Sequence, residues 1–134
     1  MATVIDARQL KNLDTTGKFV LYCGPTVEAV SISKSVANEL LHIKPRRRSF
    51  MIEQCLSRAV ENYEDNVIVR DIDLLFNPEY QIDVLKILVS CCKKKPIRAV
   101  WPGTITDTEL IYASDGYSDY KKYRLNDYDI ICVV

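Results

Sequence analysis

The chain has 134 residues, of which 48% are apolar, and its 18 basic side chains balance its 18 acidic ones. This length predicts one domain, residues 1–134, with no room for a second. The balanced charge excludes a global field that would draw the chain onto nucleic acid or an anionic membrane. No run of about 18 apolar residues predicts a membrane span, and we expect a cytoplasmic protein without membrane contact.

The first elements in chain order are a lead-in segment, a buried strand and a helix. Within residues 1–17, the weak apolar spacing of Ala2–Leu13 predicts a short helix. Lys18–Cys23 is nearly continuous in apolar residues, which is typical of a strand covered on both faces in a parallel sheet. Lys34 and Ser35 then open an amphipathic helix that ends near Ile43, because Pro45 disfavours helical geometry in the residue before it.

Helices and strands alternate along the rest of the chain. Ser49 is a plausible N-cap for a helix through Tyr63, and Ile82–Cys92 predicts another helix. The remaining apolar runs predict strands at Asn66–Asp71, Ile97–Trp101, Thr108–Ala113 and Asp129–Val134. With five strands and about three helices, this order predicts a single three-layer α/β domain with a mostly parallel sheet.

Residues Lys18–Leu40 have the layout of a phosphate-binding strand, loop and helix. In the motif G-x-x-x-x-G-K-[ST], the glycines let backbone N–H groups surround the phosphates, the lysine reaches them, and the hydroxyl holds Mg²⁺. Lys34 and Ser35 match the last two positions, but Glu28 and Ser33 stand at the glycine positions. The nearest glycine, Gly24, lies further upstream and is the third candidate nucleotide-binding residue.

A second candidate site follows the predicted strand at Asn66–Asp71. An acidic residue at the end of a buried strand beside a phosphate loop is where nucleotidases hold Mg²⁺. Asp71 stands at that position, so Asp71 and Ser35 are the candidate metal ligands, and Asp73 is the candidate for orienting water.

Structural explanations remain open for all of these residues. Lys34 and Ser35 also fit the solvated first turn of a helix, capped by Ser31 or Ser33. Asp71 and Asp73 equally fit loop acids that pair with Arg70 or accept backbone hydrogen bonds.

Two basic segments are candidates for nucleic-acid binding. The first is Arg46, Arg47 and Arg48, which also fits a solvated turn. The second interleaves Lys121, Lys122 and Arg124 with tyrosines between Tyr117 and Tyr123, as in single-strand binders. That pattern equally describes a half-exposed hairpin or a protein interface.

Other cofactors and nucleophilic catalysis find no support in the sequence. Four of the five cysteines lie in apolar runs, which predicts buried reduced thiols. No C-x-x-C occurs and His42 is the only histidine, so neither zinc nor haem is expected. A single histidine also leaves no evident base to activate a serine or cysteine.

Three further segments carry a resemblance to a known family: Ile72–Pro78 with its LFNP sequence, Val100–Gly103 with W-x-G, and Tyr112–Tyr120 with two spaced tyrosines. Together they resemble BrxF, the small P-loop protein of type 3 BREX phage-defence systems. The resemblance implies a RecA-like, P-loop-like core with ATP and Mg²⁺ as cofactors. It also implies a bacterial antiviral defence system whose other proteins are the partners.

The chain departs from this family in the phosphate loop, where the glycines are replaced and residues are inserted between Gly24 and Lys34. We therefore expect an accessory defence component that binds nucleotide weakly or not at all, acts mainly through protein contacts, and has weak or lost ATPase activity. The alternatives are a small active Mg²⁺-dependent ATPase and a nucleic-acid-binding module. Because arginine fingers in this class commonly come from a neighbouring subunit, a homo-oligomer is a further expectation.

Overall fold

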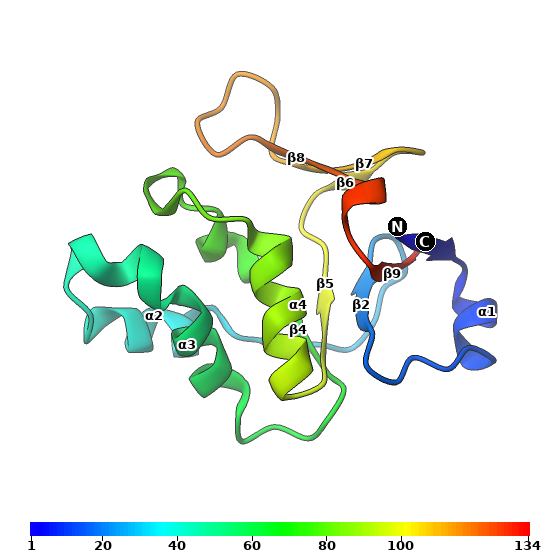
Figure 1. The fold of residues 1–134 in the computed structure, drawn as a ribbon, viewed down its shortest axis with the longest axis horizontal. Coiled ribbons are helices and arrows are strands. Elements are labelled where there is room, and N and C mark those ends of the chain that lie inside the picture. The colour runs from blue at the N-terminus through cyan, green and yellow to red at the C-terminus, as the bar shows by residue number, and fades with distance from the viewer.

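The computed structural model describes all residues, 1–134, as an α/β fold (Figure 1). Four α-helices are present: α1 (Ala7–Lys11), α2 (Ser33–Leu41), α3 (Arg48–Val60) and α4 (Val84–Lys94). Four short 3₁₀ helices are η1 (Pro45–Arg47), η2 (Ile72–Phe76), η3 (Pro78–Tyr80) and η4 (Leu125–Asp127). The strands are β1 (Thr3–Ile5), β2 (Phe19–Tyr22), β3 (Val30–Ser31), β4 (Val67–Arg70), β5 (Ile97–Val100), β6 (Thr104–Ile105), β7 (Glu109–Tyr112), β8 (Lys121–Arg124) and β9 (Ile130–Val133).

The strands form two sheets. The larger one has six strands in the order β1-β9-β2-β5-β4-β3, and every neighbouring pair is parallel. The prediction of an α/β fold with a mostly parallel sheet is therefore confirmed. The predicted strand at Thr108–Ala113 exists as β7, but it lies in a separate antiparallel sheet, β6-β7-β8, at the upper end of the molecule in Figure 1.

The two faces of the large sheet are covered unequally. Along β2, Phe19 and Leu21 belong to the main core cluster, to which α2, α3 and α4 contribute. The intervening residues Val20 and Tyr22 point to the other face, because successive side chains of a strand alternate. There they pack in a small separate cluster, against which only Leu10 of α1 and two further side chains are placed.

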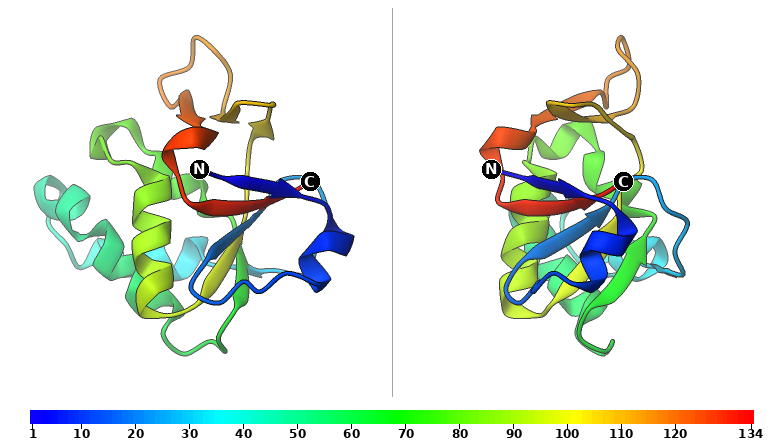
Figure 2. Two further views of the ribbon diagram at one scale, coloured as in Figure 1. Left: turned by 45° about the vertical axis from the view of Figure 1, so that its right-hand side comes forward. Right: turned by 90° about the vertical axis from the view of Figure 1, so that its right-hand side faces the viewer.

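The thin cover has its origin in the connection from β2 to β3. Parallel strands are normally joined by a crossover of a dozen or more residues, usually with a helix. Here only the seven residues 23–29, between Tyr22 and Val30, make the connection, and they contain no helix. In the right-hand view of Figure 2, this light-blue segment passes the sheet on the side away from α4.

One local prediction holds only in part, and another is wrong. The expected helix over Ala2–Leu13 is split: Thr3–Ile5 pair with β9 as strand β1, and α1 starts only after Asp6, which forms a capping box with Gln9. Ser49 does not cap α3, because the helix already begins at Arg48, continuing from η1 without a side-chain cap. No helix is long and apolar enough to cross a membrane.

Candidate functional site

The predicted nucleotide site falls at the edge of the large sheet where its parallel strands end. Gly24 follows β2, Trp101 follows β5, Asp71 follows β4, and α2 starts shortly after β3. The chain leaves β2 toward β3 on one side and leaves β5 toward β9 on the other. Ligands of open α/β sheets bind at such a switch point, so the edge between β2 and β5 is where a nucleotide would be expected.

The structure does not bring Gly24 and Lys34 together into one loop. In the strand order, β5 and β4 lie between β2 and β3, and three strand spacings amount to about 14 Å. Residue 24 is therefore at the start of a crossing segment, and residue 34 lies beyond its far end. A Cβ atom on Gly24 would lie 3.4 Å from the backbone of Val134.

Lys34 and Ser35 belong to the first turn of α2. Ile32 is the N-cap residue, without a side-chain hydrogen bond. The hydroxyls of Ser31 and Ser33 lie 3.2 Å from each other, so neither serine caps the helix. Lys34 is exposed and forms no ion pair, while Ser35 is half-buried. This arrangement matches the structural interpretation of a solvated first helical turn.

Asp71 lies close to the start of α2, but its side chain pairs with Arg70 and not with Lys34. Ser31 pairs with Arg70, and the Ile32 amide donates to the Arg70 carbonyl over 3.2 Å, which sets the start of α2 beside the end of β4. Asp71 adopts a left-handed conformation with φ 62°. Its Oδ2 accepts a hydrogen bond of 2.8 Å from Arg70 Nη1. The alternative that Asp71 pairs with Arg70 is thus observed.

Asp73 is engaged by a tyrosine from the other sheet. The Tyr112 hydroxyl donates to Asp73 Oδ1 over 3.1 Å. Burial, with a further contribution from this hydrogen bond, raises the pKa of Tyr112 to about 12. The tyrosine therefore stays protonated as a donor, and Asp73 holds it in place at the start of η2.

Above the ends of β4 and β5, the edge is filled by buried aromatic rings. Phe76 stacks on Tyr112 with centroids 3.8 Å apart and meets Trp101 edge-on at 5.6 Å. Tyr123 contacts both Phe76 and Trp101. We call Phe76, Trp101, Tyr112 and Tyr123 the aromatic cluster, and none of its members is more than 9% exposed. Side chains therefore occupy the space directly above these two strands.

Close backbone packing holds the small sheet over this cluster. A Cβ atom on Gly103 would overlap the carbonyl oxygen of Ile111 in the neighbouring strand β7. Trp101 Nε1 donates to the Thr104 carbonyl over 3.0 Å. Only glycine fits this position, which explains the sequence W-P-G after β5. The sequence shows the W-P-G residues, but it carries no signal that Trp101 meets Phe76 and Tyr112.

The predicted basic segments have different environments. Arg48 donates from Nε to the carbonyls of Leu40 and Ile43, at 3.1 and 3.2 Å, and so ties the end of α2 to the start of α3. Arg46 and Arg47 are exposed without a side-chain partner.

The tyrosine-rich basic segment forms a hairpin, which was one of the alternatives that the sequence left open. β8 pairs with β7, with Lys122 and Arg124 exposed and Tyr123 between them buried. The Lys122 ammonium lies 5.8 Å from the ring centroid of Tyr120, and Lys121 is half-buried. Figure 1 shows η1, at the start of α3, and β8 in separate parts of the molecule, so these cations do not form one surface.

Thiols and carboxylates near the edge do not assemble into a reactive or metal-binding group. The neighbouring Cys132 thiol, together with burial, raises the pKa of Cys23, so Cys23 stays a neutral thiol. All five cysteines are free. No group of three or more His, Cys, Asp or Glu side chains is placed to hold a metal ion.

Comparisons with protein-family models, with curated proteins and with solved structures found no match to this chain.

Proposed function

We propose that the chain is an accessory component of a bacterial anti-phage defence system of the BREX type. Its core is a RecA-like nucleotide-binding fold that has lost its phosphate loop, and it works through contacts with other proteins. The observation that carries this proposal is the crossover from β2 to β3, which has one glycine, Gly24, and no helix at the place where a glycine-rich phosphate loop and its helix belong.

The strand order supports a RecA-like origin. The strand that would carry the phosphate loop, β2, is central, and the strand that ends in Asp71, β4, is separated from it by β5 alone. This arrangement places an acidic strand end across the edge from the loop-bearing strand, as a site for Mg²⁺ and phosphate requires. Lys34, however, is displaced onto α2 beyond β3.

The segments of the family resemblance meet in space, which also supports the proposal. Ile72–Pro78 contributes Phe76, Val100–Gly103 contributes Trp101, and Tyr112–Tyr120 begins with Tyr112, and these three rings touch one another. Residues far apart in the sequence thus form one packing unit.

The thinly covered sheet face favours a role in assembly. Parallel sheets are usually covered on both faces, but here segment 23–29 leaves an open groove of about 610 Å³ over Ala29, Val30 and Ile68. A partner that covers this face would take the place of the missing crossover helix.

A phage-plaquing assay in the bacterium that encodes the chain tests this function. We expect plaquing efficiency to rise when the chain is deleted, and to fall again when either the natural chain or Lys34→Ala is restored. If deletion leaves plaquing unchanged, the defence role is wrong. If the natural chain restores protection and Lys34→Ala does not, Lys34 serves a working nucleotide site, and the ATPase alternative replaces our proposal.

A further inference from the structure

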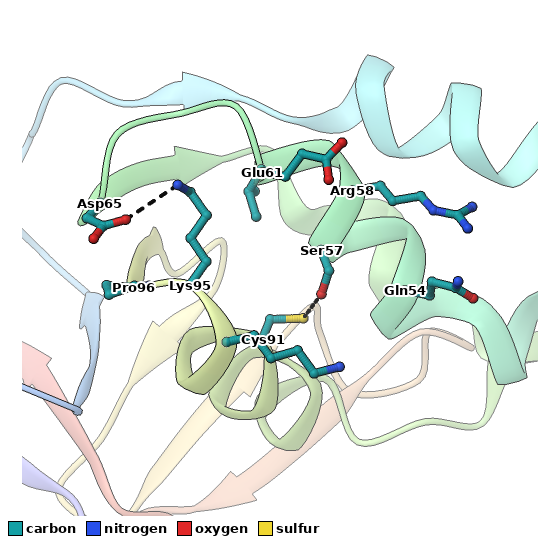
Figure 3. Close-up of a pocket in the computed structure, with 10 residues that line it drawn as sticks. Gln54, Ser57, Arg58, Glu61, Asp65, Cys91, Lys95 and Pro96 are labelled. Carbon is teal, nitrogen blue, oxygen red and sulfur yellow. Dashed lines mark hydrogen bonds and ion pairs between the residues drawn. The ribbon is translucent and has the colours of Figure 1, made fainter.

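A groove between the C-terminal halves of α3 and α4 lies away from the edge discussed above. It measures about 610 Å³, and it reaches from Gln54 and Arg58 on α3 to Lys95 and Pro96, just before β5 (Figure 3). Pro96 precedes the first residue of β5, so the groove sits beside the opposite end of the sheet from Trp101. Binding of a ligand in this groove would therefore not depend on a nucleotide at the other end of the sheet.

The outward face of α3 extends this groove toward an exposed aromatic ring. Phe50, Gln54, Ser57 and Glu61 recur at spacings of four, three and four residues, so they share one face of the helix and its end. The last three line the groove. Phe50 lies one turn beyond it and is 84% exposed, more than any other large apolar residue.

A second exposed apolar side chain and three cations lie at the same corner. Leu41, at the end of α2, is 72% exposed. Arg48 fixes that end of α2 against the start of α3 through the carbonyls of Leu40 and Ile43. We call Leu41, Lys44, Arg46, Arg47 and Phe50 the α2–α3 corner.

The corner carries uncompensated positive charge. Lys44, Arg46 and Arg47 take part in no ion pair, and residues 41–50 include no acid. The acids next to it are already matched: Glu39 lies 3.7 Å from Arg58, and Glu53 lies 3.0 Å from Lys94. A chain of zero net charge therefore concentrates free cations around two exposed apolar side chains.

The groove itself argues against a nucleic acid as the ligand. Glu61 and Asp65 line it beside the cations, and a phosphate backbone that followed the groove would meet these carboxylates. A peptide can place its acidic side chains at the corner alone and cross the groove with neutral ones. Aromatic and arginine side chains, which the corner combines, are enriched in protein interfaces.

We propose that the α2–α3 corner and the α3–α4 groove dock an acidic segment of a partner protein. An apolar side chain of that segment packs on Phe50 and Leu41, and its carboxylates meet Lys44, Arg46 and Arg47. This inference rests on the proposed function, since it names a second surface for protein contacts, apart from the sheet face over Ala29, Val30 and Ile68.

Selection from a random peptide library, with the purified full chain as the target, tests the proposal. We expect the enriched peptides to combine Asp or Glu with a large apolar residue. Synthetic copies, measured by fluorescence anisotropy, should lose affinity about 30-fold or more for Phe50→Ser and for the double variant Arg46→Glu, Arg47→Glu. Tyr117→Ser removes a matched aromatic that is 69% exposed in another part of the chain, and it should bind like the natural protein.

The docking surface is wrong if the library yields no enriched peptides, or if the enriched peptides contain no acidic residues. It is also wrong if Phe50→Ser binds these peptides as tightly as the natural chain does. Tight binding of a single-stranded thymidine oligonucleotide, if the arginine double variant abolishes it, would assign the corner to nucleic acid instead. If deletion of the chain raises plaquing but Phe50→Ser still protects fully, the defence function stands and this surface is wrong.

Discussion

Replacement of Phe76 by alanine tests whether the aromatic cluster fills the sheet edge as a structural core. Phe76 is 2% exposed and contacts three other rings. A buried aromatic side chain removes roughly 200 Å² from water, which at about 25 cal/mol per Å² is worth roughly 5 kcal/mol. Because alanine keeps a small part of this burial, we expect Phe76→Ala to lower the free energy of unfolding by about 4 kcal/mol.

Urea denaturation followed by tryptophan fluorescence suits this measurement, because Trp101 is the only tryptophan and its ring lies 5.6 Å from that of Phe76. Phe50→Ala is the matched control: it removes the same side chain from an exposed position, and we expect a change of less than about 0.5 kcal/mol. If the two variants lose similar stability, or if Phe76→Ala loses less than about 1 kcal/mol, the edge is not packed as described and space for a ligand exists there.

Three further predictions concern the backbone, a helix junction and pH. Gly103→Ala should destabilise the protein by about 3 kcal/mol in the same assay, because the new methyl overlaps the Ile111 carbonyl oxygen. Gly24→Ala is the control: its new methyl makes ordinary contacts, so it should cost less than about 1 kcal/mol. Equal losses in the two variants would contradict the packing of β6 on β7. Arg48→Ala should lower the free energy of unfolding by about 1.5 kcal/mol, because it leaves the carbonyls of Leu40 and Ile43 without their charged donor. An equal loss in Arg47→Ala would contradict this role of Arg48. Burial raises the pKa of Tyr112 and of Tyr123 from 10.0 to about 12 each. Since the unfolded chain loses these protons first, the stability that the two protonated tyrosines contribute should be complete below pH 10 and fall between about pH 10 and 12. The fall should be smaller in Tyr112→Phe, and a free energy of unfolding that is flat over this range would refute the burial of both hydroxyls.

The strands of the large sheet could be predicted wherever they are continuously apolar. Val67–Arg70 and Ile130–Val133 lie in the parallel sheet, and such runs identify strands without knowledge of their neighbours. β1 could not be found in this way, because Thr3–Ile5 become a strand only by pairing with residues 131–133 at the other end of the chain. The two residues of β3 likewise depend on Val69 and Arg70.

The candidate site was harder to predict because a sequence motif gives the spacing of residues along the chain but not the path that the backbone takes between them. Lys34 and Ser35 follow an apolar strand and open a helix, as a phosphate loop requires. The sequence did not reveal that the chain first crosses two strands and pairs Val30 with Val69. The pairing of Asp71 with Arg70 was one of two open interpretations, since adjacent opposite charges permit it locally. The contact between Tyr112 and Asp73 spans 39 residues and carries no local signal.

Calorimetric titration of the full chain with ATP and Mg²⁺ tests most directly whether the nucleotide site has been lost. With Lys34 and Gly24 on either side of a helix-free crossover, we expect no binding at micromolar nucleotide, and identical traces for the natural chain and Lys34→Ala. Micromolar affinity that disappears in Lys34→Ala would contradict the account, because it would require residues 24–35 to close around a triphosphate.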